Sequence, residues 1–241
     1  MMRSFLLLIF TMLSVSMTAQ RTCGSADLLE KQLLDDPSME ERMQAIERFT
    51  TQYLKSPLRS NADQQITIPI VFHIVYSSEE GNVSQAQIES QLRILNEDFQ
   101  RLNADTTGTP EVFQPVAADL NITFCLATID PDGNPTTGIT RTATSVESFS
   151  SSSDDIYFDA RGGKDAWDPS SYLNFWVCNL ANGLLGFAQY PGGPEASDGV
   201  VVGYRYFGDI GTAVSPFNLG RTGTHEVGHY FNLRHIWGNG D

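Results

Sequence analysis

Three of the four histidines in this 241-residue sequence lie in one short stretch, HEVGHYFNLRH. On an α-helix, residues four apart share one face, so His225 and His229 can direct their imidazoles at the same metal ion, with Glu226 beside them. His235 can supply a third ligand only if the helix ends before it, because a position six residues further along the helix points away from the metal. The spacing therefore predicts a zinc site in which the chain turns back after the helix.

The turn before the last of these histidines needs an unusual backbone conformation. A chain that reverses this sharply passes through the left-handed region, for which Gly is the best residue and Asn the next choice. Asn232 stands at this point of the sequence. We expect it to form the bend, at a cost below about 1–2 kcal/mol relative to Gly.

Three neutral imidazoles leave one coordination position of Zn²⁺ open, which is the arrangement of a catalytic rather than a structural zinc. The pKa of a zinc-bound water in that position falls toward about 7. Glu226 can then act as the general base, accepting a proton from the water and delivering it to a leaving amine. The stretch predicts zinc-dependent hydrolysis of amide bonds. Histidines that serve only as polar helix residues are the alternative.

The elements that must hold this stretch indicate one mixed domain. Residues 66–76 are a continuous β-branched, apolar run, typical of a buried strand, and we interpret the histidine inside it as a core residue. A capping box followed by apolar residues at helical spacing predicts a helix over residues 84–103. Further strands are expected at residues 122–128, 172–180 and 199–206. This order is typical of an α/β or α+β domain.

The composition and the first residues indicate a secreted globular protein. The net charge of −14 argues against nucleic acid and membrane surfaces as partners, because both select basic proteins. An early Arg, an apolar run and a small residue for cleavage predict a signal peptide over residues 1–19. The apolar run is too interrupted to be a membrane anchor. We therefore expect an extracellular protein.

A second segment precedes the mixed domain. Residues 25–54 have apolar residues at helical spacing, with a capping box at residues 38–41. The polar stretch from Lys55 to Gln65 contains a proline and is interpreted as an exposed linker that can be processed.

The zinc stretch and its surroundings resemble a known family. HExxHxxNxxH is similar to the metzincin signature HExxHxxGxxH, and NLGRTGTHEVGHYFNLRHIWG resembles its pappalysin and cytophagalysin branch. IPIVFHIVY, FCLATIDPDGNPTTGITR and YLNFWVCNLANGLLGFAQYPGG also resemble secreted members, so the likeness covers residues 65–241. It implies a zincin-like metzincin fold, with a twisted mixed β-sheet, a backing helix and an active-site helix. It also implies that His225, His229 and His235 bind zinc, that Glu226 is the base, and that substrates are proteins or peptides.

The resemblance implies two further sites. An edge strand formed by Leu185, Gly186, Phe187 and Ala188 would offer backbone groups to a peptide substrate that adds as an antiparallel strand. An ordinary hairpin is the alternative. Cys23, in RTCG, resembles the cysteine switch of zinc-protease propeptides, in which a thiolate takes the position of the catalytic water. The alternative is that this cysteine bridges elsewhere.

The expected organisation is a signal peptide (1–19), a propeptide with the cysteine switch (20–60) and a catalytic domain (61–241) that ends before the metzincin Met-turn. We expect the C-terminal subdomain, with any Ca²⁺ site, to be missing. Cys125 and Cys178 lie on expected strands, either paired or as buried free thiols. The sequence thus predicts a secreted zinc endopeptidase made as a latent zymogen. A non-catalytic extracellular binding module that contains zinc is the competing hypothesis.

Overall fold

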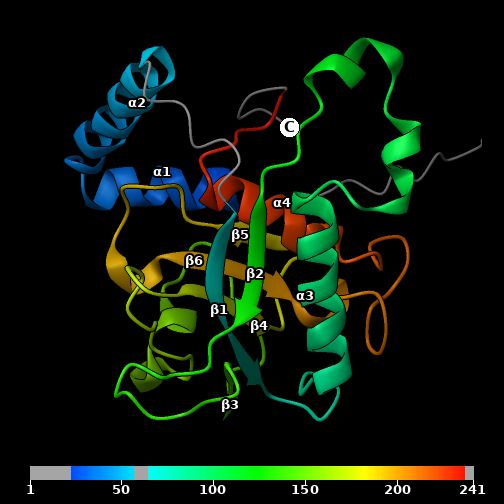
Figure 1. Ribbon diagram of the computed structural model, residues 1–241. Helices are drawn as coiled ribbons and strands as arrows, with labels where there is room; N and C mark the ends of the chain where they lie inside the picture. Colours follow the sequence, from blue (N-terminus) through cyan, green and yellow to red (C-terminus); the bar gives the residue numbers. More distant parts are fainter. Residues whose placement is uncertain (1–22, 57–64, 237–241) are drawn as a thin grey trace, which may run out of the picture.

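The apolar run at residues 66–76 forms the longest strand of a mixed sheet in the computed structural model, which describes residues 23–56 and 65–236 (Figure 1). The signal peptide expected over residues 1–19 lies outside the described residues. The helices and strands in chain order are α1 (Ser25–Asp35), α2 (Met39–Lys55), β1 (Ile66–Tyr76), α3 (Gln85–Phe99), β2 (Ile122–Leu126), β3 (Ile139–Ala143), β4 (Leu173–Cys178), β5 (Gly186–Ala188), β6 (Gly199–Gly203) and α4 (Arg221–Tyr230). Among the described residues, no helix is long and apolar enough to cross a membrane.

The sheet has the strand order β2-β1-β4-β6-β5, and β3 also pairs with β1. Strand β1 is long enough for β2 to pair with residues 66–70 and for β3 to pair with residues 72–76. Both pairs are parallel, and so are the pairs that β4 forms with β1 and with β6. In contrast, β5 runs antiparallel to β6. Because β5 is the last strand of the order, one of its backbone edges is left to contact something other than the sheet.

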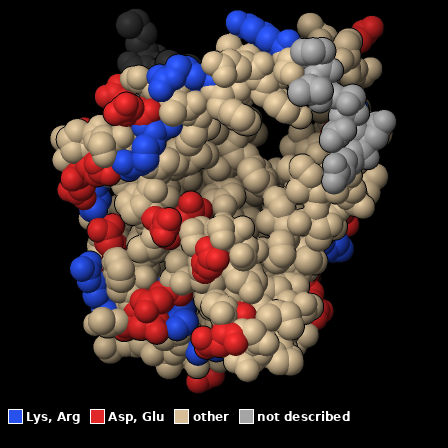
Figure 2. Space-filling model, turned by 60° about the vertical axis from the view of Figure 1, so that its left-hand side comes forward, with Lys and Arg blue, Asp and Glu red and all other residues tan. Residues whose placement is uncertain are grey.

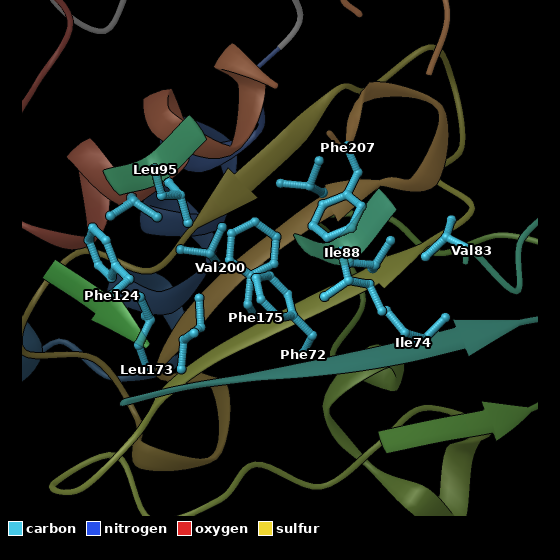
Figure 3. Close-up of a cluster of buried hydrophobic side chains, with 14 of the residues drawn as sticks. Phe72, Ile74, Val83, Ile88, Leu95, Phe124, Leu173, Phe175, Val200 and Phe207 are labelled. Carbon is cyan, nitrogen blue, oxygen red and sulfur yellow. The ribbon is translucent and has the colours of Figure 1, made fainter. Parts of the chain in front are cut away.

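The larger hydrophobic cluster fills the face of the sheet that α3 covers. Alternate residues of β1 point to opposite faces. Ile70, Phe72 and Ile74 lie on this face, and they pack with Ile88 and Leu95 of α3. Figure 3 shows Phe72, Ile74, Ile88 and Leu95 among the side chains of this cluster. The helical spacing that predicted α3 is therefore the spacing of the residues it buries.

His73 points to the other face of β1, where it is fully buried. Its Nδ1 lies 2.8 Å from Thr140 Oγ1, and its Nε2 lies 3.1 Å from Asn174 Oδ1. The ring also packs against Trp176, with 5.3 Å between the ring centroids. The structure thus confirms that His73 is a core histidine with satisfied ring nitrogens.

Two buried glutamines of α3 hold the loop that leads to α4. Gln87 Nε2 donates to Phe207 O at 2.9 Å, and its Oε1 accepts from the backbone N–H of Thr212 at 3.1 Å. Gln91 Nε2 donates to Gly220 O at 3.0 Å. Since buried polar groups are costly unless they are hydrogen-bonded, these amides fix where α4 begins.

Two predicted helices differ from those observed. Ser84 caps α3 through its side chain, as predicted, but the helix ends at Phe99 because Arg101 takes a positive φ of 54°. The predicted helical segment 25–54 is divided into α1 and α2 near Pro37, whose ring cannot continue a helix. Ser38 itself is in a helical conformation, and its side chain makes no capping hydrogen bond.

Strand β1 forms with its predicted bounds, and the three further expected strands form somewhat shorter than predicted. The sequence pattern did not reveal β3, because three of its five residues are polar. The three cysteines are free, so the pairing left open for Cys125 and Cys178 does not occur. These residues lie on β2 and β4, with β1 between them. Strands two apart in a sheet are separated by about 10 Å, which is beyond the reach of a disulfide.

Candidate active site

Helix α4 and the turn after it bring the three histidines together. His225 and His229 share one face of α4, and their Nε2 atoms are 3.1 Å apart. Asn232 adopts a φ of 68°, in the left-handed region, and Leu233 N donates back to Gly228 O at 2.9 Å. The chain therefore reverses, and His235 Nε2 lies 3.1 Å from the Nε2 atoms of both other histidines.

The donor set fits a zinc ion. Imidazole nitrogens about 2.0–2.1 Å from a tetrahedral zinc are about 3.3 Å from one another, close to the triangle of 3.1 Å edges in the structure. His229 Nδ1 lies 2.7 Å from Leu233 O, which it can reach only as a donor, so its Nε2 keeps a lone pair. Burial lowers the pKa of His229 and favours this neutral form. Three nitrogens that converge on one point are best explained by a cation between them.

Glu226 lies beside this triangle and is almost fully buried, with 1% of its surface exposed. Its Oε2 accepts a hydrogen bond of 3.0 Å from Ser25 Oγ and lies 3.5 Å from Cys23 Sγ. A Cβ atom at Gly186 would come within 2.9 Å of Glu226 Cγ. Glycine at this point of β5 thus leaves room for the carboxylate at the edge of the sheet.

Cys23 completes the cluster from the opposite end of the chain. Its Sγ and one ring nitrogen of each of the three histidines lie within 4.8 Å of one another. In the absence of a cation, burial and the nearby Glu226 carboxylate raise the pKa of Cys23 to about 12. A metal at the histidines would reverse this effect, since a coordinating thiol is deprotonated. The geometry therefore allows Cys23 to be a fourth ligand.

The N-terminal segment, defined here as residues 23–56, begins along the outer edge of β5. Cys23 forms a parallel bridge with Gly186, and Gly24 N donates to Gly186 O at 2.9 Å. The backbone N–H of Ala188 donates to Ser25 Oγ at 2.9 Å. The chain from Cys23 to Ser25 therefore lies in the cleft between β5 and α4.

The residues predicted on the edge strand do not all face this cleft. Gly186 O and Ala188 N point outward, as the contacts of the N-terminal segment show. In contrast, Leu185 O accepts from Gly203 N at 2.9 Å and so faces β6, and the Phe187 side chain is buried in the core. The structure shows that β5 pairs antiparallel with β6, as a hairpin would, and that β5 is the last strand of the order. Binding of a peptide substrate at its outer edge stays a prediction.

Two residues near the site carried no recognisable sequence signal. Ser25 contacts both the carboxylate of Glu226 and the edge strand, yet a serine at the start of a helix is ordinarily only a cap. Tyr190 packs against His229, with 5.3 Å between ring centroids, and Arg234 lies 4.7 Å above the tyrosine ring. Only the tertiary fold brings these residues to the metal ligands.

Substitutions at Asn232 test whether its left-handed conformation sets the position of His235. A β-branched residue strongly disfavours this conformation, so Asn232→Val is expected to weaken zinc binding roughly 5- to 30-fold, corresponding to about 1–2 kcal/mol. Asn232→Gly should keep zinc affinity, because glycine adopts the conformation freely. Competition with a zinc-binding dye measures both variants. Equal affinity of the valine and glycine variants would contradict this role.

Comparisons with known proteins agree with this geometry. Residues 157–241 match the sequence profile of a peptidase family described as pregnancy-associated plasma protein-A. An extracellular metalloprotease of Arthroderma gypseum is 26% identical over 230 residues, which are 93% of this chain and 63% of the relative. A mutant of promirolysin from Tannerella forsythia is 47% identical, with a TM-score of 0.81 over 91% of this chain and 71% of that one. The chain belongs to the pappalysin family of metzincin-type metallopeptidases.

Membership in this family confirms the zincin-like fold class that the sequence predicted. Mature mirolysin of Tannerella forsythia, solved in complex with a cleaved peptide, is 52% identical, with a TM-score of 0.70 over 72% of this chain and 66% of that one. The likeness to promirolysin thus extends over more of this chain than the likeness to the mature form. The chain spans 63% of the length of the curated relative from Arthroderma gypseum.

Proposed function

We propose that this protein is a secreted, zinc-dependent endopeptidase made as a latent zymogen. The observation that carries the proposal is the convergence of three imidazole nitrogens beside a buried glutamate, next to the edge strand β5. The names of the relatives, which are extracellular metalloproteases, support it. A zinc module without activity would not need a carboxylate buried beside the three histidines.

In this proposal His225, His229 and His235 hold the zinc ion. When bound, the metal would act as a Lewis acid that acidifies a water molecule and polarises the scissile carbonyl. Glu226 takes a proton from the water and passes it to the nitrogen of the leaving amine. Its burial beside Gly186 keeps the carboxylate oriented toward the cleft, so little reorganisation is needed during the reaction.

The substrate in this proposal is an extended peptide that pairs with β5. Gly186 O and Ala188 N are the groups that would hydrogen-bond to it, while Leu185 and Phe187 hold the strand in place. We expect the substrate to run antiparallel to β5. The N-terminal segment forms a parallel bridge there instead, and so it presents its peptide bonds to Glu226 in the reverse direction. This orientation supports its role as an inhibitory pro-segment.

The proposed organisation follows the predicted boundaries, with a signal peptide over residues 1–19, a pro-segment over 20–60 and a catalytic domain from residue 61 onward. The pro-segment covers the site by placing Cys23 at the metal ligands and Ser25 on Glu226. Promirolysin, the similar protein whose structure retains a pro-form, supports this assignment. Removal of the segment would free the cleft.

Peptide cleavage profiling tests the proposed function. The complete gene product, activated by proteolysis, is incubated with a peptide mixture, and the products are identified by mass spectrometry. We expect internal cleavages that stop when a zinc chelator is added and return when zinc is restored. Absence of cleavage by protein that has been shown to contain stoichiometric zinc would favour the binding module instead.

Replacing Cys23 tests the proposed switch. Cys23→Ala should remove the sulfur ligand from the unprocessed precursor, so its cobalt-substituted form should lack the sulfur-to-cobalt charge-transfer band. We also expect measurable activity before processing, although less than in the activated enzyme, because Ser25 still contacts Glu226. An absorption spectrum and an activity assay on the precursor measure the two effects. An unchanged spectrum would remove Cys23 as a ligand.

A further inference from the structure

The N-terminal segment is held to the rest of the chain by contacts that extend well beyond the metal ligands. Leu28, with 1% of its surface exposed, lies in the same hydrophobic cluster as Tyr157 and Phe187. Met39, which is fully buried, lies in a third cluster with Leu29 and Tyr190. The segment therefore contributes side chains to two cores that the rest of the chain would otherwise leave open to water.

Polar contacts fix the register of α1 on this surface. Gln32 is 5% exposed, and its Nε2 donates to Gln189 Oε1 at 2.7 Å and to Ser197 Oγ at 3.3 Å. Lys31 Nζ lies 3.1 Å from Asp154 Oδ2. Figure 2 views the side of the molecule on which α1 and α2 lie and shows acidic and basic side chains interspersed there. A buried amide pair flanked by an ion pair favours one docked position of α1 over others.

Helix α2 adds contacts on either side of the metal site. Arg42 Nε donates to Gly192 O at 2.7 Å, in the loop between β5 and β6. Glu47 Oε1 accepts a hydrogen bond of 2.7 Å from Asn232 Nδ2, at the bend that carries the third histidine. The segment thus touches the cleft from the edge strand to the end of α4.

All of these contacts are made by residues 23–47, whereas the peptide that joins the segment to the sheet lies between Ser56 and Gln65. A cut in that peptide breaks none of the contacts. We infer that the surface formed by β5, the Gln189–Ser197 loop and the segment around Asp154 and Tyr157 is a docking site for the pro-segment as a separate chain. The inference rests on the proposed function, since it concerns how the site is opened.

Activation of such a complex requires more than a cut in the linker. After a single cut in the linker, Ser25 still bonds to Glu226 and to Ala188, and Leu28 and Gln32 still hold α1 in place. The cut protein is therefore a two-chain complex that stays closed. Opening the site needs a second event, either dissociation of the segment or a cut within residues 23–47.

A nicked precursor tests this directly. The complete gene product carries Glu226→Gln, which prevents self-digestion but keeps an acceptor for Ser25, and a recognition site for an unrelated protease between Ser56 and Gln65. After the cut, size-exclusion chromatography at micromolar concentration should show the segment eluting with the catalytic part in a one-to-one ratio. Separate elution of the two pieces would overturn the inference.

Competition with synthetic peptides identifies the contacts that hold the cut segment in place. Because the substitutions are made in the peptides, the result does not depend on folding of a variant precursor. In the nicked Glu226→Gln protein, unlabelled peptides of residues 20–56 compete with a labelled one for the place of the cut segment. The peptide with Leu28→Asp should compete at least about a hundredfold less well than the unaltered peptide, because docking would bury the new carboxylate in the hydrophobic cluster. Leu34→Asp, the same change at a position of α1 that is 76% exposed, is the matched control and should compete normally.

The Cys23→Ala peptide separates docking from metal binding. It should compete within about tenfold of the unaltered peptide, since one contact among many is lost. If it fails to compete while Leu28→Asp competes normally, the thiol alone holds the segment and the inference is wrong. Because binding is measured on an inactive variant, this result is independent of whether the activated protein cleaves peptides.

Discussion

Replacing Glu226 by Ala in the activated enzyme is expected to lower kcat/KM for peptide hydrolysis by about two to four orders of magnitude while the protein retains its metal. The physical reason is that the metal cluster consists of the three histidines and Cys23, so the metal does not need this carboxylate, whereas Glu226 is the buried acidic side chain next to His225 that can accept the proton. A loss of this size corresponds to about 3–5 kcal/mol of transition-state stabilisation. Steady-state kinetics on one identified peptide gives the value.

Two controls make the result specific. Metal analysis of the same preparation shows whether zinc content is unchanged, and Glu226→Gln keeps the shape and packing beside Gly186 while removing the basic group. Both variants should be similarly slow. A glutamine variant with normal activity would show that Glu226 holds the cleft open and does not move the proton.

The folding stability of the protein is expected to fall by about 3 kcal/mol between pH 6.5 and pH 4 because of His73 alone. Burial lowers the pKa of His73 to about 4, with a smaller effect of the same sign from Lys164. Above pH 6.5 the ring is neutral in both the folded and the unfolded state, so its contribution is constant. Below pH 6.5 the unfolded chain binds a proton that the folded chain excludes, and stability is lost until pH 4 is reached.

Denaturant unfolding of the Glu226→Ala precursor at several pH values measures this loss, with His73→Gln in the same background as the control. The glutamine lacks the titration but can still hydrogen-bond toward Thr140 and Asn174. The difference between the two free energies of unfolding should therefore change with pH, by about 3 kcal/mol in total. Parallel curves for the two proteins would show that the ring titrates equally in both states.

Much of the fold could be predicted from the sequence because its elements have strong local patterns. The run at residues 66–76 is apolar apart from Thr67 and His73, and it forms β1 with the predicted bounds. The capping box at Ser84 starts α3 where expected. The end of α3 was predicted four residues too late, since Leu102 fits the helical spacing yet is 70% exposed. Apolar spacing cannot show where a left-handed residue stops a helix.

The zinc stretch is a local pattern as well, so its ligands could be proposed without a structure. The positions of His225 and His229 follow from the period of one helix, and the position of His235 follows from a bend at one residue. The donor atoms lie together because eleven consecutive residues are sufficient to place them. The role of Glu226 as the base remains a proposal, supported by its position beside these atoms.

The partners that come from distant parts of the chain were decided by the tertiary structure. Ser25 reaches Glu226 across 201 residues, and Gln32 reaches Gln189 across 157. Neither pair has a spacing or residue type that marks it in the sequence, since serine and glutamine are ordinary residues of helices and loops. The sequence by itself determined the group of three histidines on and after α4, and the long strand β1. Only the packing of α1 against β5 decided which groups close the site, because contacts of long sequence separation depend on the complete sheet.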